Sequence, residues 1–88
     1  MNSTAQTMTL SPNPFRNSTV IGLPTGAASR QTVVKIYDLS GKVVEDLSAA
    51  IRISGEAAWK PAGLSGGVYI AKAVMGTRQV SKTLMFQK

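Results

Sequence analysis

The groups best suited to acid–base chemistry in this chain of 88 residues are four carboxylates, all in one central segment. They are Asp38, Glu45, Asp46 and Glu56. The chain contains no histidine and no cysteine, so it lacks the commonest general base and metal ligand, as well as any thiol nucleophile. This composition excludes a metallohydrolase, a Ser/His/Asp hydrolase and a Cys/His protease, and we expect no enzymatic activity.

Asp38 precedes the turn-like segment LSGK, and together with Asp46 it could bind a calcium ion. Two carboxylates without a D-x-D-x-D-G run supply too few oxygens for calcium. An aspartate at a turn usually accepts hydrogen bonds from its own backbone. We therefore expect a structural role for Asp38, no metal site and no cofactor.

Trp59 is the only tryptophan, and it could act as a platform on which a sugar ring stacks. Such sites usually align two or three aromatic side chains, and only Tyr37 and Tyr69 could join it here. A small domain also needs a large side chain at its centre, so we expect Trp59 in the core. The alternative is a carbohydrate- or protein-binding module appended to a larger secreted enzyme.

The net charge of +6 is concentrated toward the end of the chain. From residue 60 onward there is no acid, and the basic residues are Lys60, Lys72, Arg78, Lys82 and Lys88. A basic segment can favour nucleic acid, anionic lipid headgroups or an acidic partner, but it can also be an ordinary solvated face. Nucleic-acid recognition usually adds aromatic side chains that stack on bases. Phe86 is the only aromatic beyond residue 72, and we expect it in the core, so we predict no nucleic-acid binding.

The N-terminal stretch MNSTAQTMTLSPNPF has neither the charged n-region nor the apolar h-region of a signal peptide. No window approaches 18 apolar residues, so we predict no insertion into a membrane. Residues 1–7 are small and polar and predict a flexible linker end, followed by one domain at 8–88. If the protein is exported, we expect its export signal on sequence that precedes this stretch.

Short alternating segments separated by turn signals dominate the chain. In VVKIYDLSGKVVEDL, Val34 and Ile36 should face the core, and Gly41 should allow a turn with positive φ, which predicts a β-hairpin. Seven strands are predicted, near 8–10, 18–23, 32–38, 43–47, 56–60, 68–75 and 79–86. The segment SAAIRISG, at 48–55, is ambiguous, and because no window shows a clear helical period we interpret it as a long connection. The pattern predicts an all-β fold, an immunoglobulin-like antiparallel β-sandwich.

Two motifs predict local geometry. The prolines of Pro12–Pro14 fix φ and bias the preceding residues toward an extended shape, so we expect a stiff corner rather than a hydrogen-bonded hairpin. In GGVYIA, Tyr69 stands near the start of the penultimate strand, where immunoglobulin-like sandwiches fold a tyrosine hydroxyl back onto the backbone. We expect that tyrosine corner here, with Ala71 facing the core and Gly66 and Gly67 allowing a tight turn.

Four segments in order, LSPNPF, VKIYDLSGKVV, GLSGGVYIAKA and KTLMFQK, give the chain a family resemblance. It resembles the C-terminal sorting domain carried by cargo of the type IX secretion system, which is related to the immunoglobulin-like domain of flagellar hook-capping proteins. The resemblance runs from about Thr9 to Lys88. Arg16 and Asn17 depart from the family, which often has Asn-Pro at this point.

The resemblance implies a non-catalytic module on a larger cargo protein of Bacteroidetes-type bacteria, exported to the outer membrane, the cell surface or the medium. It implies two partners: an outer-membrane translocon that recognises the folded sandwich, and a sortase-like surface protease that removes it. The cargo is then released or attached to a lipopolysaccharide anchor. The sorting-motif residues carried over from the family are Pro12, Asn13, Pro14, Gly67, Tyr69, Lys82 and Lys88. We expect recognition to use the last strand and its lysines, by addition of a strand at a sheet edge.

Overall fold

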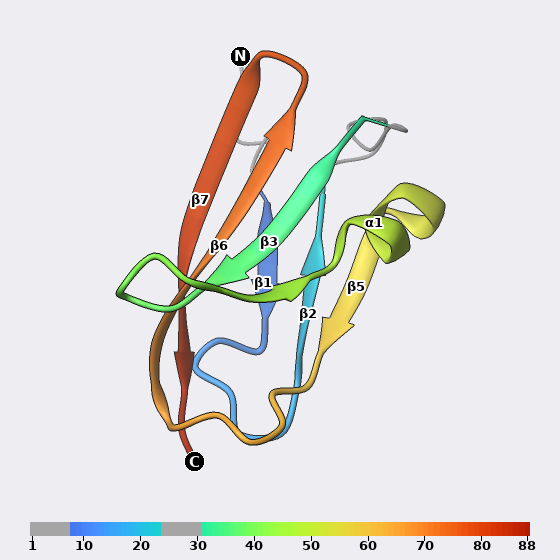
Figure 1. Ribbon diagram of the computed structural model, residues 1–88. Helices are drawn as coiled ribbons and strands as arrows, with labels where there is room; N and C mark the ends of the chain where they lie inside the picture. The colour runs from blue at the N-terminus through green and yellow to red at the C-terminus, as the bar shows by residue number, and fades with distance from the viewer. Residues whose placement is uncertain (1–7, 24–30) are drawn as a thin grey trace, which may run out of the picture.

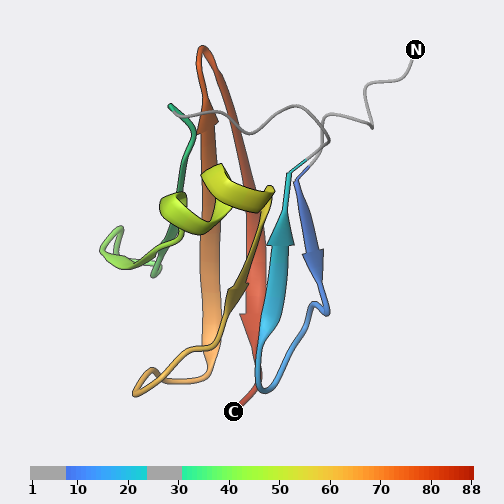
Figure 2. The same ribbon diagram turned by 90° about the vertical axis from the view of Figure 1, so that its right-hand side faces the viewer.

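Alternation of apolar and polar residues builds two antiparallel sheets in the computed structural model, which describes residues 8–23 and 31–88 (Figure 1). One sheet has the strand order β1-β2-β5, and the other has the order β4-β3-β6-β7. The strands are β1 (Thr9–Ser11), β2 (Thr19–Gly22), β3 (Val33–Tyr37), β4 (Val43–Asp46), β5 (Glu56–Trp59), β6 (Gly67–Met75) and β7 (Arg78–Phe86). Figure 2 shows the two sheets edge-on, packed face to face. The predicted all-β sandwich is confirmed, and the linker end predicted at 1–7 lies outside the described residues.

The β3–β4 hairpin forms as its alternation predicts. Val34 and Ile36 are fully buried between the sheets, whereas Lys35 and Tyr37 lie half-buried on the outer face. Gly41 has a φ of 91°, a conformation that side chains disfavour, and this lets the chain reverse. Complete burial of each aliphatic side chain stabilises the fold by about 1.5–3 kcal/mol, so Val34 and Ile36 anchor β3, an inner strand of the larger sheet, to the core.

One short helix, α1 (Ser48–Ser54), stands where we expected a connection without helical structure, so that prediction was wrong. Asp46 accepts a hydrogen bond from the backbone N–H of Ser48 (2.9 Å) at the start of the helix. Gly55 ends the helix with a φ of 79° and donates its N–H to the carbonyl of Ile51 (2.7 Å). The helix has seven residues, and Ile51 is its fully buried apolar residue. A segment this short does not show a helical period in the sequence. No helix within 8–23 or 31–88 is long and apolar enough to cross a bilayer.

An aromatic cluster fills one end of the core. Trp59 is 2 % exposed, and its ring lies 5.8 Å from Phe15 and 5.5 Å from Tyr69, measured between centroids. Phe15 stacks on Phe86 at 5.3 Å. Such ring pairs add about 0.5–1.5 kcal/mol each beyond the area they bury. The expected core position of Trp59 is confirmed, and the cluster ties both sheets to the segment between β1 and β2.

Candidate recognition site

Two of the four carboxylates, Asp38 and Asp46, accept hydrogen bonds from neighbouring residues and so stabilise local structure. Asp38 accepts hydrogen bonds from the Ser40 hydroxyl (2.6 Å), the Ser40 N–H (2.9 Å) and the Lys42 N–H (3.0 Å). These bonds, the one from the Ser40 hydroxyl above all, hold the pKa of Asp38 below its ordinary value. Across the described residues, no three acidic side chains gather to hold a metal ion. Asp38 is therefore a turn residue, as its position in the sequence predicts.

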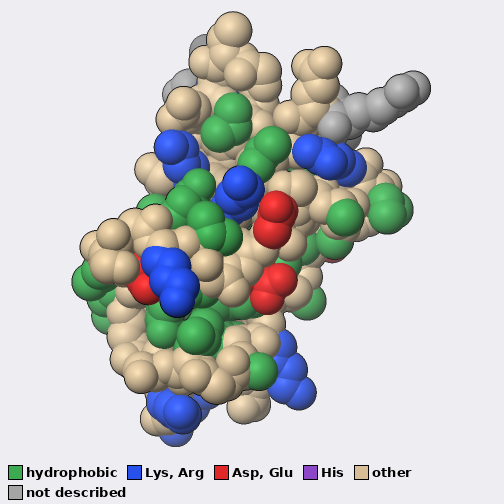
Figure 3. Space-filling view, viewed as in Figure 1, with side chains coloured by type: hydrophobic (Ala, Val, Ile, Leu, Met, Phe, Trp, Pro, Cys, Tyr) green, Lys and Arg blue, Asp and Glu red, His purple; other side chains and the backbone are tan. Residues whose placement is uncertain are grey.

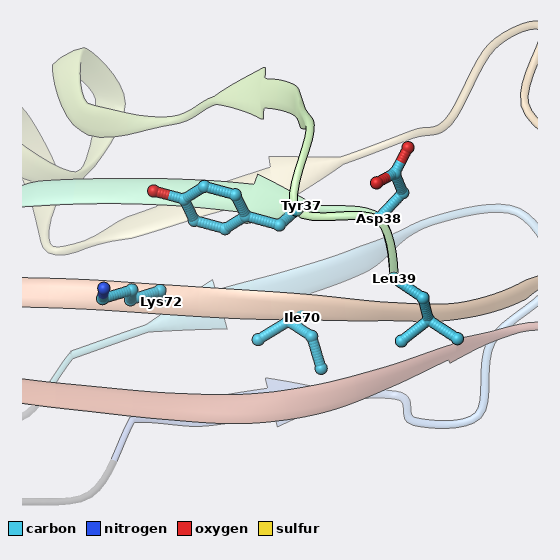
Figure 4. Close-up of a pocket in the computed structure, with 6 residues that line it drawn as sticks. Tyr37, Asp38, Leu39, Ile70 and Lys72 are labelled. Atoms are coloured by element: carbon cyan, nitrogen blue, oxygen red, sulfur yellow. The ribbon is translucent and has the colours of Figure 1, made fainter.

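A shallow depression of about 380 Å³ lies between the β3–β4 turn and β6. It is lined by Tyr37, Asp38, Leu39, Gly41, Ile70 and Lys72 (Figure 4). In Figure 4 the Asp38 carboxylate points away from Ile70 and Lys72, toward its own turn. Leu39 is 72 % exposed, so the depression could receive an apolar side chain. The Asp38 carboxylate at its rim already accepts three hydrogen bonds within its own turn.

Basic side chains are spread over the face of the four-stranded sheet. Figure 3 shows Lys and Arg scattered among hydrophobic and acidic side chains rather than gathered in one patch. Phe86 and Leu84, the apolar residues of the basic end, are buried in the core. Both observations agree with an ordinary solvated face.

The Pro12–Pro14 corner docks onto the edge of β7. The Asn13 side chain donates from Nδ2 to the carbonyl of Thr83 (3.0 Å), and its Oδ1 accepts the N–H of Met85 (3.0 Å). One acceptor and one donor of β7 are thereby satisfied, as a neighbouring strand would satisfy them. The peptide bonds preceding both prolines are cis. We expected a stiff corner rather than a hydrogen-bonded hairpin, but β1 and β2 do pair antiparallel on either side of it.

Phe15 continues this edge contact through its backbone. Its N–H donates to the carbonyl of Met85 (2.9 Å), and its carbonyl accepts the N–H of Gln87 (2.8 Å). This contact could not be predicted, because a single sequence does not reveal which distant backbone segments pair. The corner and the end of β7 consequently form one continuous surface.

The Gly-x-Tyr motif fixes the start of β6 at the same end of the sandwich. The Tyr69 hydroxyl donates to the carbonyl of Ser65 (2.6 Å), which confirms the predicted tyrosine corner. A Cβ on Gly66 would lie only 3.1 Å from the backbone nitrogen of Lys88, so this glycine lets the chain end pass close by. Gly67 pairs with Phe86 in the β6–β7 ladder and has a φ of 153°.

The two motif lysines differ in position. Lys88 donates from Nζ to the carbonyl of Leu64 (3.2 Å), which places it beside the Gly-x-Tyr motif. Lys82 lies further back along β7, opposite Ala71, and is exposed. The structure thus brings Pro12–Pro14, the Gly-x-Tyr motif and Lys88 together at the C-terminal end of β7. It does not bring Lys82 into that group.

The family model of the secretion system C-terminal sorting domain matches residues 9–87. This domain is the sorting signal of type IX secretion, a non-catalytic targeting module that marks proteins for the cell surface or the extracellular space. No curated protein matches the chain. The alternative of a sugar-binding module is not favoured, because Trp59 is buried. The chain belongs to the family of secretion system C-terminal sorting domains.

Proposed function

We propose that this domain delivers its parent protein by presenting the C-terminal end of the sandwich to the outer-membrane translocon of the type IX system. A sortase-like surface protease then separates the domain from its cargo. The residues proposed to carry recognition are Pro12, Asn13, Pro14, Gly67, Tyr69, Lys82 and Lys88. The observation that carries this proposal is that all of these motif residues except Lys82 meet at one end of the fold, although they are far apart in the sequence.

The contacts within this surface form only when the domain is folded. Asn13 reaches Thr83 and Met85 across 70 and 72 residues of sequence, so these hydrogen bonds exist only when both sheets have assembled. A receptor that binds this surface would therefore accept the folded domain and pass over an unfolded chain. No chemistry on the part of the domain is required for that selection.

A fusion of a reporter protein to this domain tests the proposal in a bacterium with type IX secretion. Deletion of Ser81–Lys88 should abolish surface display and leave the reporter in the periplasm. Because this deletion also removes Leu84 and Phe86 from the core, a second variant is needed. Lys82→Ala should lower surface display without unfolding the domain, and Lys60→Ala, also exposed and basic, is the matched control. Normal display of the truncated fusion would overturn the proposal.

We place the protease cut at or before residues 1–7. Met8 is fully buried, and β1 begins at the next residue, so a cut further along would remove a core side chain. Mass spectrometry of the domain released from cells should find its first residue at or ahead of position 8. A released fragment that begins within or after β1 would contradict this placement.

A further inference from the structure

The edges of the two sheets differ greatly in length. The outer strands β1, β4 and β5 have three or four residues each, and short edges of this kind offer little to an incoming strand. The fourth edge, β7, has nine residues and contains no proline or bulge. Figure 1 shows β7 as the outermost strand of its sheet. It is the edge on which another strand could most readily pair.

Backbone alternation shows which groups of β7 face outward. The bonds made by Asn13 and Phe15 all involve Thr83, Met85 and Gln87. Successive residues of a strand direct their backbone N–H and carbonyl groups to opposite sides. The N–H and carbonyl groups of the odd-numbered residues of β7 therefore point away from β6. The same alternation directs the N–H and carbonyl groups of Gln79 and Ser81 outward.

The corner at Pro12–Pro14 therefore covers only half of this edge. The corner forms hydrogen bonds with the carbonyl of Thr83 and with both the N–H and the carbonyl of Met85, but it forms none with the N–H of Thr83. Within 8–23 and 31–88, no residue bonds to the outward groups of Gln79 and Ser81 or to the N–H of Thr83. We call the stretch Gln79–Thr83 the open edge; all of its residues except the half-buried Val80 are exposed, and it could pair with about five residues of another strand.

Charge selects the kind of strand that would fit. Lys82 pairs with Ala71 in the ladder, so its side chain lies on the same face as that fully buried residue, yet it is exposed. From residue 57 to residue 88 there is no acidic side chain to neutralise it. A carboxylate on an incoming strand, directly opposite Lys82, would lie about 5 Å away between Cβ atoms.

A second copy of this domain is a poor occupant of the open edge. Antiparallel pairing of two β7 strands about Ser81 would place two Lys82 side chains on one face, close to each other, between molecules that each carry a net charge of +6. An inward-facing lysine on an edge strand is a known device against such self-pairing.

We propose that the open edge Gln79–Thr83 binds an extended, acidic β-strand of a partner protein by backbone pairing. This inference rests on the proposed function, in which the partner is a component of the export machinery. The corner at Asn13 sets the limit of the added strand, because it already occupies the edge beyond Thr83. Backbone bonds would supply affinity, and the carboxylate opposite Lys82 would supply selectivity.

A titration followed by NMR tests the proposal with two macrocyclic β-hairpin peptides as probes. In one the outer strand alternates glutamate with valine, and in the other it alternates lysine with valine. The glutamate peptide should shift the amide signals of Gln79, Ser81 and Thr83 and bind about tenfold more tightly than the lysine peptide. Lys82→Glu should reverse this preference. Equal binding of both peptides, or shifts confined to the depression at Leu39, would overturn the proposal.

Ser81→Pro is the decisive variant, and Ser81→Ala is its matched control. Proline removes the Ser81 N–H, to which no other described residue forms a hydrogen bond. The β6–β7 ladder should therefore stay intact and the melting temperature should stay unchanged. Binding of the glutamate peptide should fall about tenfold with proline and stay unchanged with alanine. Equal binding by the two variants would refute the edge pairing.

The same pair of variants separates this inference from the proposed function. In the reporter fusion, Ser81→Pro should block surface display while Ser81→Ala permits it. If the fusion with the natural sequence is not displayed, the proposed function fails. If that fusion and both variants are displayed equally, the export role stands and the open edge is not where recognition occurs.

Discussion

Asn13→Ala is the change that best tests how the corner is held on the edge of β7. The substitution removes the hydrogen bond donated to the Thr83 carbonyl and the one accepted from the Met85 N–H, both 3.0 Å long. A hydrogen bond contributes about 0.5–1.5 kcal/mol net, and water can partly replace these two because the site is exposed. We therefore expect the free energy of unfolding to fall by about 1–2 kcal/mol. For a domain of this size each kcal/mol lowers the melting temperature by about 4–8 °C.

Thermal unfolding followed by circular dichroism measures the loss, with Asn17→Ala as the control. Asn17 lies in the same loop, is exposed, and makes no hydrogen bond that the described part of the chain records. Hydrogen exchange localises the effect, because the Met85 amide should exchange faster in Asn13→Ala. The Gln87 amide, which donates to Phe15, should lose protection to a lesser degree.

The reasoning fails if Asn13→Ala and Asn17→Ala melt at the same temperature. It also fails if the Met85 amide keeps its protection after the change, because the side-chain Oδ1 of Asn13 would then not be its acceptor. A lower melting temperature with unchanged exchange at Met85 would point to altered backbone preferences in the corner instead.

Three further changes test other parts of the fold by thermal unfolding. Tyr69→Phe removes the 2.6 Å bond to the Ser65 carbonyl and should cost about 1 kcal/mol; no loss would exclude the tyrosine corner as a stabilising contact. Gly55→Ala puts a side chain at a φ of 79° and should cost about 1 kcal/mol, and a neutral result would mean that α1 ends differently. Asp38→Asn tests linkage. Because hydrogen bonds lower the pKa of Asp38 below 3.8 in the folded state, the ionised carboxylate stabilises the fold above that pH. The difference in melting temperature from the natural chain should be constant near neutrality and shrink as the pH falls through the folded pKa; a difference that grows on acidification would contradict the assignment.

Strands and turns could be predicted from the sequence because their information is local. The alternation of Val34 and Ile36 with polar neighbours fixes which face is buried, and Gly41 marks the reversal. The tyrosine corner was predictable as well, because Tyr69 and its acceptor Ser65 are four residues apart. In each case the residues that decide the structure are close together in the chain.

The helix and the long-range contacts could not be predicted in the same way. Helix α1 buries Ile51 in the core, and tertiary packing stabilises so short a helix. Its seven residues show no clear periodic pattern from which it could have been predicted. The contact between Asn13 and β7 joins residues 70 or more positions apart, and the amide side chain carries no mark of its partner. The sequence did not reveal that the Pro12–Pro14 corner lies against the edge of β7.

Most residues of the sorting motif bond within the domain, and this affects how export defects should be interpreted. Asn13 holds β7, the Pro12 carbonyl accepts the Thr19 hydroxyl (2.7 Å), and Tyr69 and Lys88 bond to backbone carbonyls. A substitution at any of these positions changes stability first, so a loss of export there does not identify a contact with the receptor. The Lys82 side chain makes no hydrogen bond within the described residues, which makes it the motif position where folding and recognition can be separated. If recognition uses charge on β7, Lys82→Ala will lower export at an unchanged melting temperature; if export changes only when the melting temperature does, stability of the fold is the whole of the signal.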